Sequence, residues 1–156
     1  MPKTILLPLS ILMLVNCQPS AETIQEAFED FQNTIISGNP RNLAEHYVKT
    51  GHFTKESNLA YASSILQFNK EHKLKTTHNL NVLYHRASGN FSAIVIVDDE
   101  STISYPAFAK KTNDKYKFFR PFNLWSNGFA VESYGLSEED TNTLKELRAW
   151  AFSKTR

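Results

Sequence analysis

The hydrophobic pattern of this chain changes its period at Thr76, and that change constrains the fold more than any other feature. Before Thr76, apolar residues recur at helical spacing, which is typical of amphipathic helices. After it, apolar and polar residues alternate along runs separated by turn residues, which is typical of antiparallel strands. A chain whose helices precede its strands in this way is predicted to be an α+β protein.

Three helices are predicted before the change of period. Thr23 and Glu26 have the spacing of a capping box, and the helical pattern that follows continues until Gly38. Pro40 is a good residue for the first turn of a second helix, and Thr54 precedes a third. The predicted helices span residues 22–37, 40–50 and 54–73.

A meander of four to five strands and a closing helix are predicted after it. The strands span residues 77–87, 91–97, 102–110 and 116–122, with a brief fifth at 129–133. Ser137 is a suitable cap for the last helix, which carries an apolar stripe of Leu144, Leu147 and Ala151. The N-terminal helices are expected to pack on a curved sheet.

Loop lengths predict which side chains share a face of this sheet. Loops of three residues at 88–90 and four residues at 98–101 and 112–115 place Tyr84 beside Ile94 and Phe118 beside Ala109. One face is then apolar and suited to burial under the helices. Its residues are Val82, Tyr84, Ile94, Ile96, Ile103, Tyr105, Phe118 and Phe122.

The same register predicts a candidate ligand pocket. It puts Arg86, Ser92, Ala107 and Arg120 in one row beside aromatic residues, and a guanidinium group matches planar anions such as carboxylate or phosphate. The alternative is that both arginines lie at the margin of the sheet and reach solvent. A shared anion also requires a strongly curved sheet, because the outer strands of a flat one stand roughly 14 Å apart. The pocket candidates are Tyr84, Arg86, Tyr105, Phe118 and Arg120.

This order of elements, from Glu22 to Ser133, resembles the nuclear-transport-factor-2-like or cystatin-like α+β fold. The resemblance implies a curved sheet that wraps a long helix, with a pocket between them. That fold includes both binding modules and enzymes, so it does not by itself define a function.

The N-terminus reads as a targeting segment. Lys3 precedes an apolar stretch from Ile5 to Val15, which is too short to span a bilayer. The run from Leu14 to Cys17 resembles the lipobox of bacterial lipoproteins, in which the cysteine is acylated and becomes the new N-terminus. The resemblance implies a signal peptide over residues 1–16, a lipid-anchor cysteine and tether over 17–21, and one domain over 22–156. It also implies a membrane-anchored protein on the periplasmic or extracellular side of a bacterial cell envelope.

Two alternatives to the lipid anchor stay open. One is a secreted protein cut after Ala21, and the other is a retained helix or a structural cysteine. Cys17 is the only cysteine of the chain, so an exported domain would have no disulfide framework.

Charge and motifs restrict the chemistry. The chain has 17 Lys and Arg against 16 Asp and Glu, and loss of Lys3 with the signal peptide leaves 16 − 16 = 0, which argues against nucleic acid as a partner. The five histidines have no spacing typical of a zinc site, so no metal or other cofactor is expected. Basic residues gather at one end of the meander, opposite the acidic turn 98–100. They are Arg86, Lys110, Lys111, Lys115 and Lys117.

These observations favour a non-catalytic, lipid-anchored module that binds a protein or a small ligand with anionic and apolar parts. An enzyme with a small pocket is the first alternative, with Tyr84 or Tyr105, His46 and Glu45 as an imaginable acid–base set. A structural accessory subunit of an envelope complex is the second.

Overall fold

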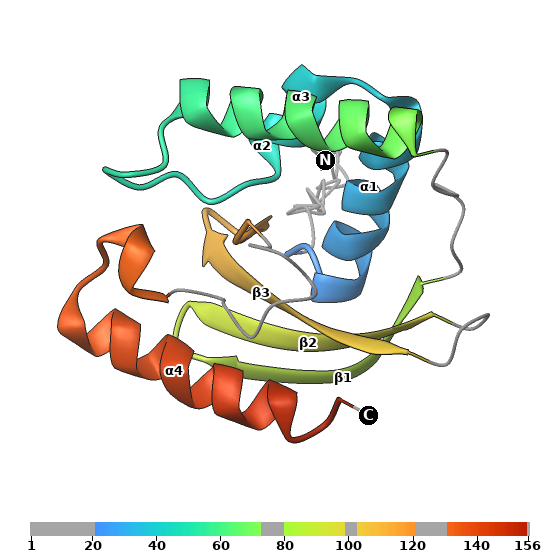
Figure 1. The fold of residues 1–156 in the computed structure, drawn as a ribbon. Coiled ribbons are helices and arrows are strands. Elements are labelled where there is room, and N and C mark those ends of the chain that lie inside the picture. Colours follow the sequence, from blue (N-terminus) through green and yellow to red (C-terminus); the bar gives the residue numbers. More distant parts are fainter. Residues whose placement is uncertain (1–20, 73–79, 99–102, 121–130, 156) are drawn as a thin grey trace, which may run out of the picture.

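A computed structural model describes residues 21–72, 80–98, 103–120 and 131–155. Within these ranges the helices lie on both sides of an open antiparallel sheet (Figure 1). The predicted α+β class is therefore confirmed. The elements are α1 (Ile24–Ser37), α2 (Pro40–Glu45), α3 (Lys55–Glu71), β1 (Leu80–Ser88), β2 (Phe91–Asp98), β3 (Ser104–Thr112), β4 (Lys115–Phe118), the 3-10 helix η1 (Val131–Tyr134) and α4 (Glu138–Phe152).

The helix starts follow the capping signals of the sequence. Thr23 and Glu26 form the predicted capping box, in which the Thr23 side chain accepts from the Glu26 N–H and the Glu26 carboxylate accepts from the Thr23 N–H. Thr54 and Ser137 cap α3 and α4 with one bond each, in which their side chains accept from the Ser57 and Asp140 N–H groups. Gly38 ends α1 in the left-handed region, with φ at 69°.

The sheet has the strand order β1-β2-β3-β4, as expected for a meander. The prediction of a fifth strand at 129–133 is wrong for residues 131–133, because Val131–Tyr134 form a 3-10 helix. Residues 129 and 130 lie outside the described residues. The fourth strand ends earlier than predicted, at Phe118.

Both faces of the sheet are covered, because β2 contributes to two separate cores. On one face Ile94 and Ile96 pack with Phe28 and other residues of α1. On the other face Ala93 and Val95 pack with α4. The three predicted stripe residues of α4 are buried there: Leu144, Leu147 and Ala151. Figure 1 shows α1 and α4 on opposite sides of the sheet.

The register differs from the prediction at the first hairpin, and the reason is the length of its turn. Ser88 pairs with Phe91 across a two-residue turn, whose Gly89 has a φ of +56°. A two-residue turn in place of a three-residue loop shifts the pairing by one residue, which reverses the face of each side chain. The shift ends at an irregularity between Val82 and Tyr84, so Val82 still pairs with Ile96 as predicted.

At the second hairpin, Ile96 pairs with Tyr105 rather than Ile103. Because this shift is by two residues, Tyr105 stays on the predicted face. Ile103, which was predicted to be buried there, is 41% exposed and is not part of the core. The pairing of Ala109 with Phe118 is confirmed. Phe122 lies outside the described residues.

Candidate functional site

The register separates the five predicted pocket residues. Arg86 pairs with Ala93 instead of Ser92, so it lies on the α4 side, where its guanidinium is 6.0 Å from the Trp150 ring centroid. Tyr84 is on the same side, and Lys154 Nζ is 6.0 Å from its ring. The predicted row of Arg86, Ser92, Ala107 and Arg120 is therefore wrong.

Two other candidates, Phe118 and Tyr105, belong to the opposite face of the sheet, and Arg120 lies beyond the end of β4. Phe118 is buried in the core under α1, and Tyr105 pairs with Ile96 of that face. Arg120 follows β4 and contacts α3. Arg86 lies over Trp150 of α4, whereas Arg120 Nε and Nη2 already donate to Asn58 and Ser57 of α3, so the two guanidinium groups have different partners.

Arg120 is a buried cation held by neutral groups. The residue is only 7% exposed, and its Nε and Nη2 donate to Asn58 Oδ1 and Ser57 Oγ, each over 2.7 Å. Its guanidinium lies 4.6 Å from the Phe53 ring centroid and 5.0 Å from that of Tyr61. Hydrogen bonds and ring faces together offset the cost of burying the charge.

The surroundings of Arg120 fix two further segments. Asn58 is completely buried and also donates from Nδ2 to the Val48 carbonyl over 3.2 Å. The Tyr134 hydroxyl donates to the Arg120 carbonyl over 3.1 Å. Burial raises the pKa of Tyr61 to about 12 and raises that of Tyr134 further, so both stay neutral. Arg120 therefore links α3, η1 and the end of β4, which is a structural role.

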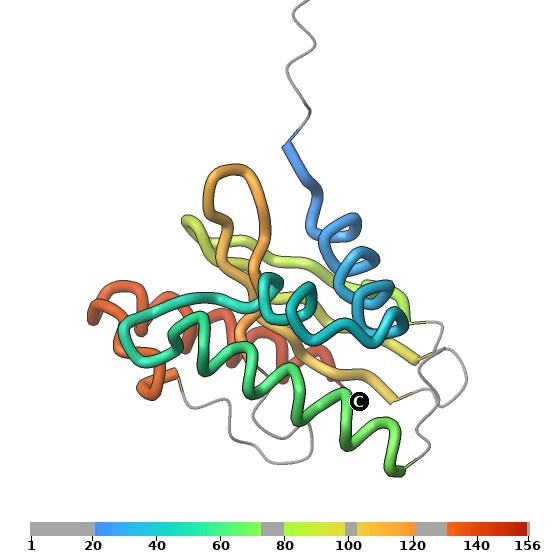
Figure 2. The backbone as a smooth tube through the Cα atoms, turned by 90° about the horizontal axis from the view of Figure 1, so that it is seen from above, coloured from blue at the N-terminus to red at the C-terminus, as the bar shows by residue number. Residues whose placement is uncertain are grey.

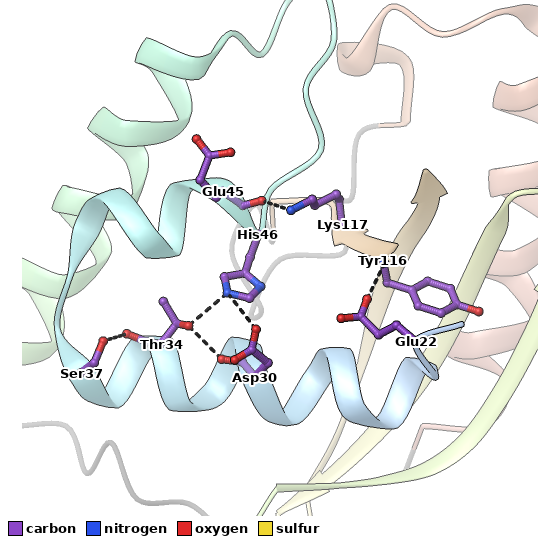
Figure 3. Close-up of polar contacts among 8 residues, drawn as sticks. All are labelled: Glu22, Asp30, Thr34, Ser37, Glu45, His46, Tyr116 and Lys117. Atoms are coloured by element: carbon purple, nitrogen blue, oxygen red, sulfur yellow. Dashed lines mark hydrogen bonds and ion pairs between the residues drawn. The ribbon is translucent and has the colours of Figure 1, made fainter. Parts of the chain in front are cut away.

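A second polar cluster surrounds His46, at the end of α2 (Figure 3). His46 Nε2 lies 3.0 Å from Thr34 Oγ1 and 3.7 Å from Asp30 Oδ2, both on α1. The Thr34 hydroxyl donates its proton to the Asp30 carbonyl over 2.9 Å. Since a hydroxyl has one proton, Thr34 Oγ1 accepts from His46, which places the imidazole proton on Nε2.

Burial lowers the pKa of His46, and the nearby Asp30 carboxylate opposes this change. The ring also packs edge-on against Phe31, with centroids 5.8 Å apart. His46 is thus neutral near pH 7 and holds α2 against α1.

The imagined acid–base set is not assembled. The Glu45 carboxylate points away from His46 (Figure 3) and pairs with Lys49 Nζ over 2.8 Å. Tyr84 lies on the α4 side of the sheet, and Tyr105 pairs with Ile96. Asp30, the actual carboxylate near His46, was not predicted. Its spacing of four residues from Thr34 puts both on one helix face, but nothing in the sequence places that face beside His46.

The basic end of the sheet adjoins the start of α1. Glu22 accepts a hydrogen bond from the Tyr116 backbone N–H over 2.8 Å, as Figure 3 shows. Tyr116 lies in β4 between Lys115 and Lys117. Glu22 therefore fixes the N-terminal end of the domain beside the β3–β4 hairpin, and Figure 2 shows these two parts at the same end of the molecule.

Metal and membrane motifs are scarce in the part of the chain that the structure describes. Its His, Asp and Glu side chains form no group of three that could hold a metal ion. None of its helices is both long enough and apolar enough to cross a membrane.

No protein-family model matches the chain, and no curated protein matches it in sequence. The functional assignment therefore depends on the chain's own residues.

Proposed function

We propose that this protein is a lipid-anchored module of the bacterial cell envelope that binds another protein. The observation that carries the proposal is the run from Leu14 to Cys17 at the end of an apolar leader. Acylation of Cys17 would add several hydrocarbon chains, which is enough for stable membrane attachment where one chain is not.

The position of the first helix supports a short tether after Cys17. Five residues, 18 to 22, lie between Cys17 and the cap Thr23. The capping box at Thr23 defines where α1 begins, so the folded domain does not need the leader for its first helix. This arrangement suits a domain that is held close to a membrane surface.

The engagement of the polar groups supports binding rather than catalysis. His46 donates to Thr34, Glu45 pairs with Lys49, and Arg120 bonds to the side chains of α3. Each of these groups has a structural partner, and no two of them converge on a common point where a substrate would sit.

Strand β1 is the surface best suited to a protein partner. It is one of the two edge strands of the described sheet, and an edge strand presents backbone groups to a further chain. Leu83 and Tyr84 are 52% and 43% exposed on it, so apolar side chains accompany the edge. A partner that adds a strand here would cover both.

Incorporation of a labelled fatty acid tests the anchor. The wild-type protein is expected to take up the label and to fractionate with membranes, whereas Cys17→Ala should do neither. Asn16→Gly is the matched control, because lipoproteins usually have a small residue before the cysteine, and it should keep both properties. A mature protein that begins at Glu22 and carries no lipid would contradict the anchor and support secretion.

A photo-crosslinking residue at position 83 tests the partner surface. It is expected to give a discrete crosslinked band in intact cells, while the same residue at Ser63, exposed on α3, should not. Identical patterns from the two positions would contradict a binding role for β1.

A further inference from the structure

We infer that the β3–β4 hairpin is a membrane-contact surface that lies against anionic lipid headgroups. The inference rests on the proposed lipid anchor at Cys17 and adds a second attachment to it. Its basis is the contact between Glu22 and Tyr116 described above.

The tether limits how far the hairpin can stand from the membrane. A fully extended chain spans at most about 3.5 Å per residue, so Glu22 lies within roughly 18 Å of Cys17. The Glu22 carboxylate bonds to the Tyr116 N–H. The distance from Cys17 to Tyr116 of the hairpin can therefore exceed this limit only by the length of the Glu22 side chain and its hydrogen bond. Acyl chains on Cys17 would therefore keep this end of the sheet close to the headgroups.

The charge of the hairpin suits an anionic surface. Residues 110–117 contain four lysines and one aspartate, so their net charge is 4 − 1 = +3, although the domain from residue 17 is neutral. Anionic lipids attract such clusters, by roughly fivefold in binding for each lysine near the surface.

The individual lysines have different surroundings. Lys117 Nζ donates to the Glu45 carbonyl, and Lys110 lies over the Phe91 ring. Lys111 and Lys115 flank the turn. Lys115 is exposed. Lys111 Nζ is 3.8 Å from the solvent-exposed Asp114 carboxylate and 5.4 Å from the Tyr116 ring centroid, so its ammonium group stays beside the turn. Lys111 and Lys115 are therefore the two expected to meet headgroups.

Asp114 lies exposed in the turn itself, and two further acidic residues at this end are engaged by backbone N–H groups. Glu22 accepts from Tyr116, and the Glu26 carboxylate is part of the capping box with Thr23. Both therefore face protein N–H groups, and the turn between Lys111 and Lys115 is the basic feature that this end presents.

The test measures how fast a water-soluble, amine-reactive reagent modifies each lysine of the acylated, membrane-reconstituted protein. One set of vesicles contains phosphatidylcholine alone, and the other contains equal parts of phosphatidylcholine and phosphatidylglycerol. Lys111 and Lys115 are expected to react several-fold more slowly on the mixed vesicles. High salt should remove the difference, and Lys70 on α3 should react equally on both.

A pair of variants isolates the hairpin. In Lys115→Glu the protection of Lys111 should be lost, whereas in Lys55→Glu, an exposed position on α3, it should remain. Equal modification of Lys111 on both vesicles would overturn the inference and leave an acidic protein as the partner of this surface. A protein that incorporates into neither vesicle would instead contradict the proposed anchor.

Discussion

Arg120 and Asn58 are joined inside the protein, with Arg120 Nε donating to Asn58 Oδ1 over 2.7 Å. They are 62 residues apart in the chain, so this hydrogen bond ties the third helix to the end of the sheet. Because both are buried, loss of Arg120 leaves Asn58 Oδ1 without this donor, and loss of Asn58 leaves Arg120 Nε without this acceptor, away from water.

Replacing Arg120 is therefore expected to destabilise the protein. Arg120→Met should lower the free energy of unfolding by about 2 to 4 kcal/mol, since it removes a charged donor and leaves Asn58 Oδ1 unsatisfied. Urea denaturation measures this. The control Arg41→Met, at an exposed position of α2, should change the free energy of unfolding by less than about 0.5 kcal/mol. A loss below about 1 kcal/mol at Arg120 would show that the link is dispensable.

The second core, under α4, gives a different prediction. Leu144 is fully buried there, so Leu144→Ala should lower the free energy of unfolding by about 2 to 5 kcal/mol through lost contacts and a cavity. Phe152, on the same helix, is 37% exposed. Phe152→Ala should cost clearly less despite its larger side chain. The reverse order would mean that α4 does not cover this face.

The capping box of α1 can be tested at Thr23. Thr23→Ala should cost about 1 kcal/mol of stability, because it leaves the Glu26 N–H without its side-chain acceptor. Thermal unfolding monitored by circular dichroism detects such a loss. Thr23→Ser should retain most of the stability, because serine also caps well, and equal losses in the two variants would argue against capping.

His46 makes stability depend on pH. Its pKa is lowered in the folded protein, so the unfolded chain binds more protons. The contribution of neutral His46 to the free energy of unfolding is complete above the unfolded pKa, near 6.5. It is lost as the pH falls below that value. The free energy of unfolding should therefore decrease between pH 7 and 5, and His46→Gln should reduce this decrease. Burial also lowers the pKa of His85. His85 is therefore expected to account for part of the pH dependence that remains in His46→Gln.

The Asp30 carboxylate supplies the control for this assignment. It raises the pKa of His46 against the effect of burial, so Asp30→Asn should lower that pKa further. Proton NMR of the imidazole as a function of pH measures the change directly. A rise in the pKa would contradict the proximity of the two groups.

Much of the fold could be predicted because its signals are local. The capping box at Thr23, the cap at Ser137 and the stripe of α4 each involve residues within a few positions of one another. The continuous apolar run of β2 is another such signal. It is typical of a strand covered on both faces, and it would have predicted the second core had it been interpreted in that way.

The prediction of the candidate pocket was wrong because the length of one turn differs by one residue from the expected length. A turn one residue shorter than expected moves Tyr84 and Arg86 to the other face, because side chains alternate along a strand. Sequence spacing does not determine where a turn closes to within one residue.

What the sequence by itself determined is the α+β class and the starts of the helices, which depend on residues close to one another in the chain. Only the tertiary structure decided that Arg120 meets Asn58, that His46 meets Thr34 and Asp30, and that Glu22 meets Tyr116. These contacts depend on how helices pack on the sheet and on its exact register. Both are set by the summed packing of many side chains and by no single local pattern.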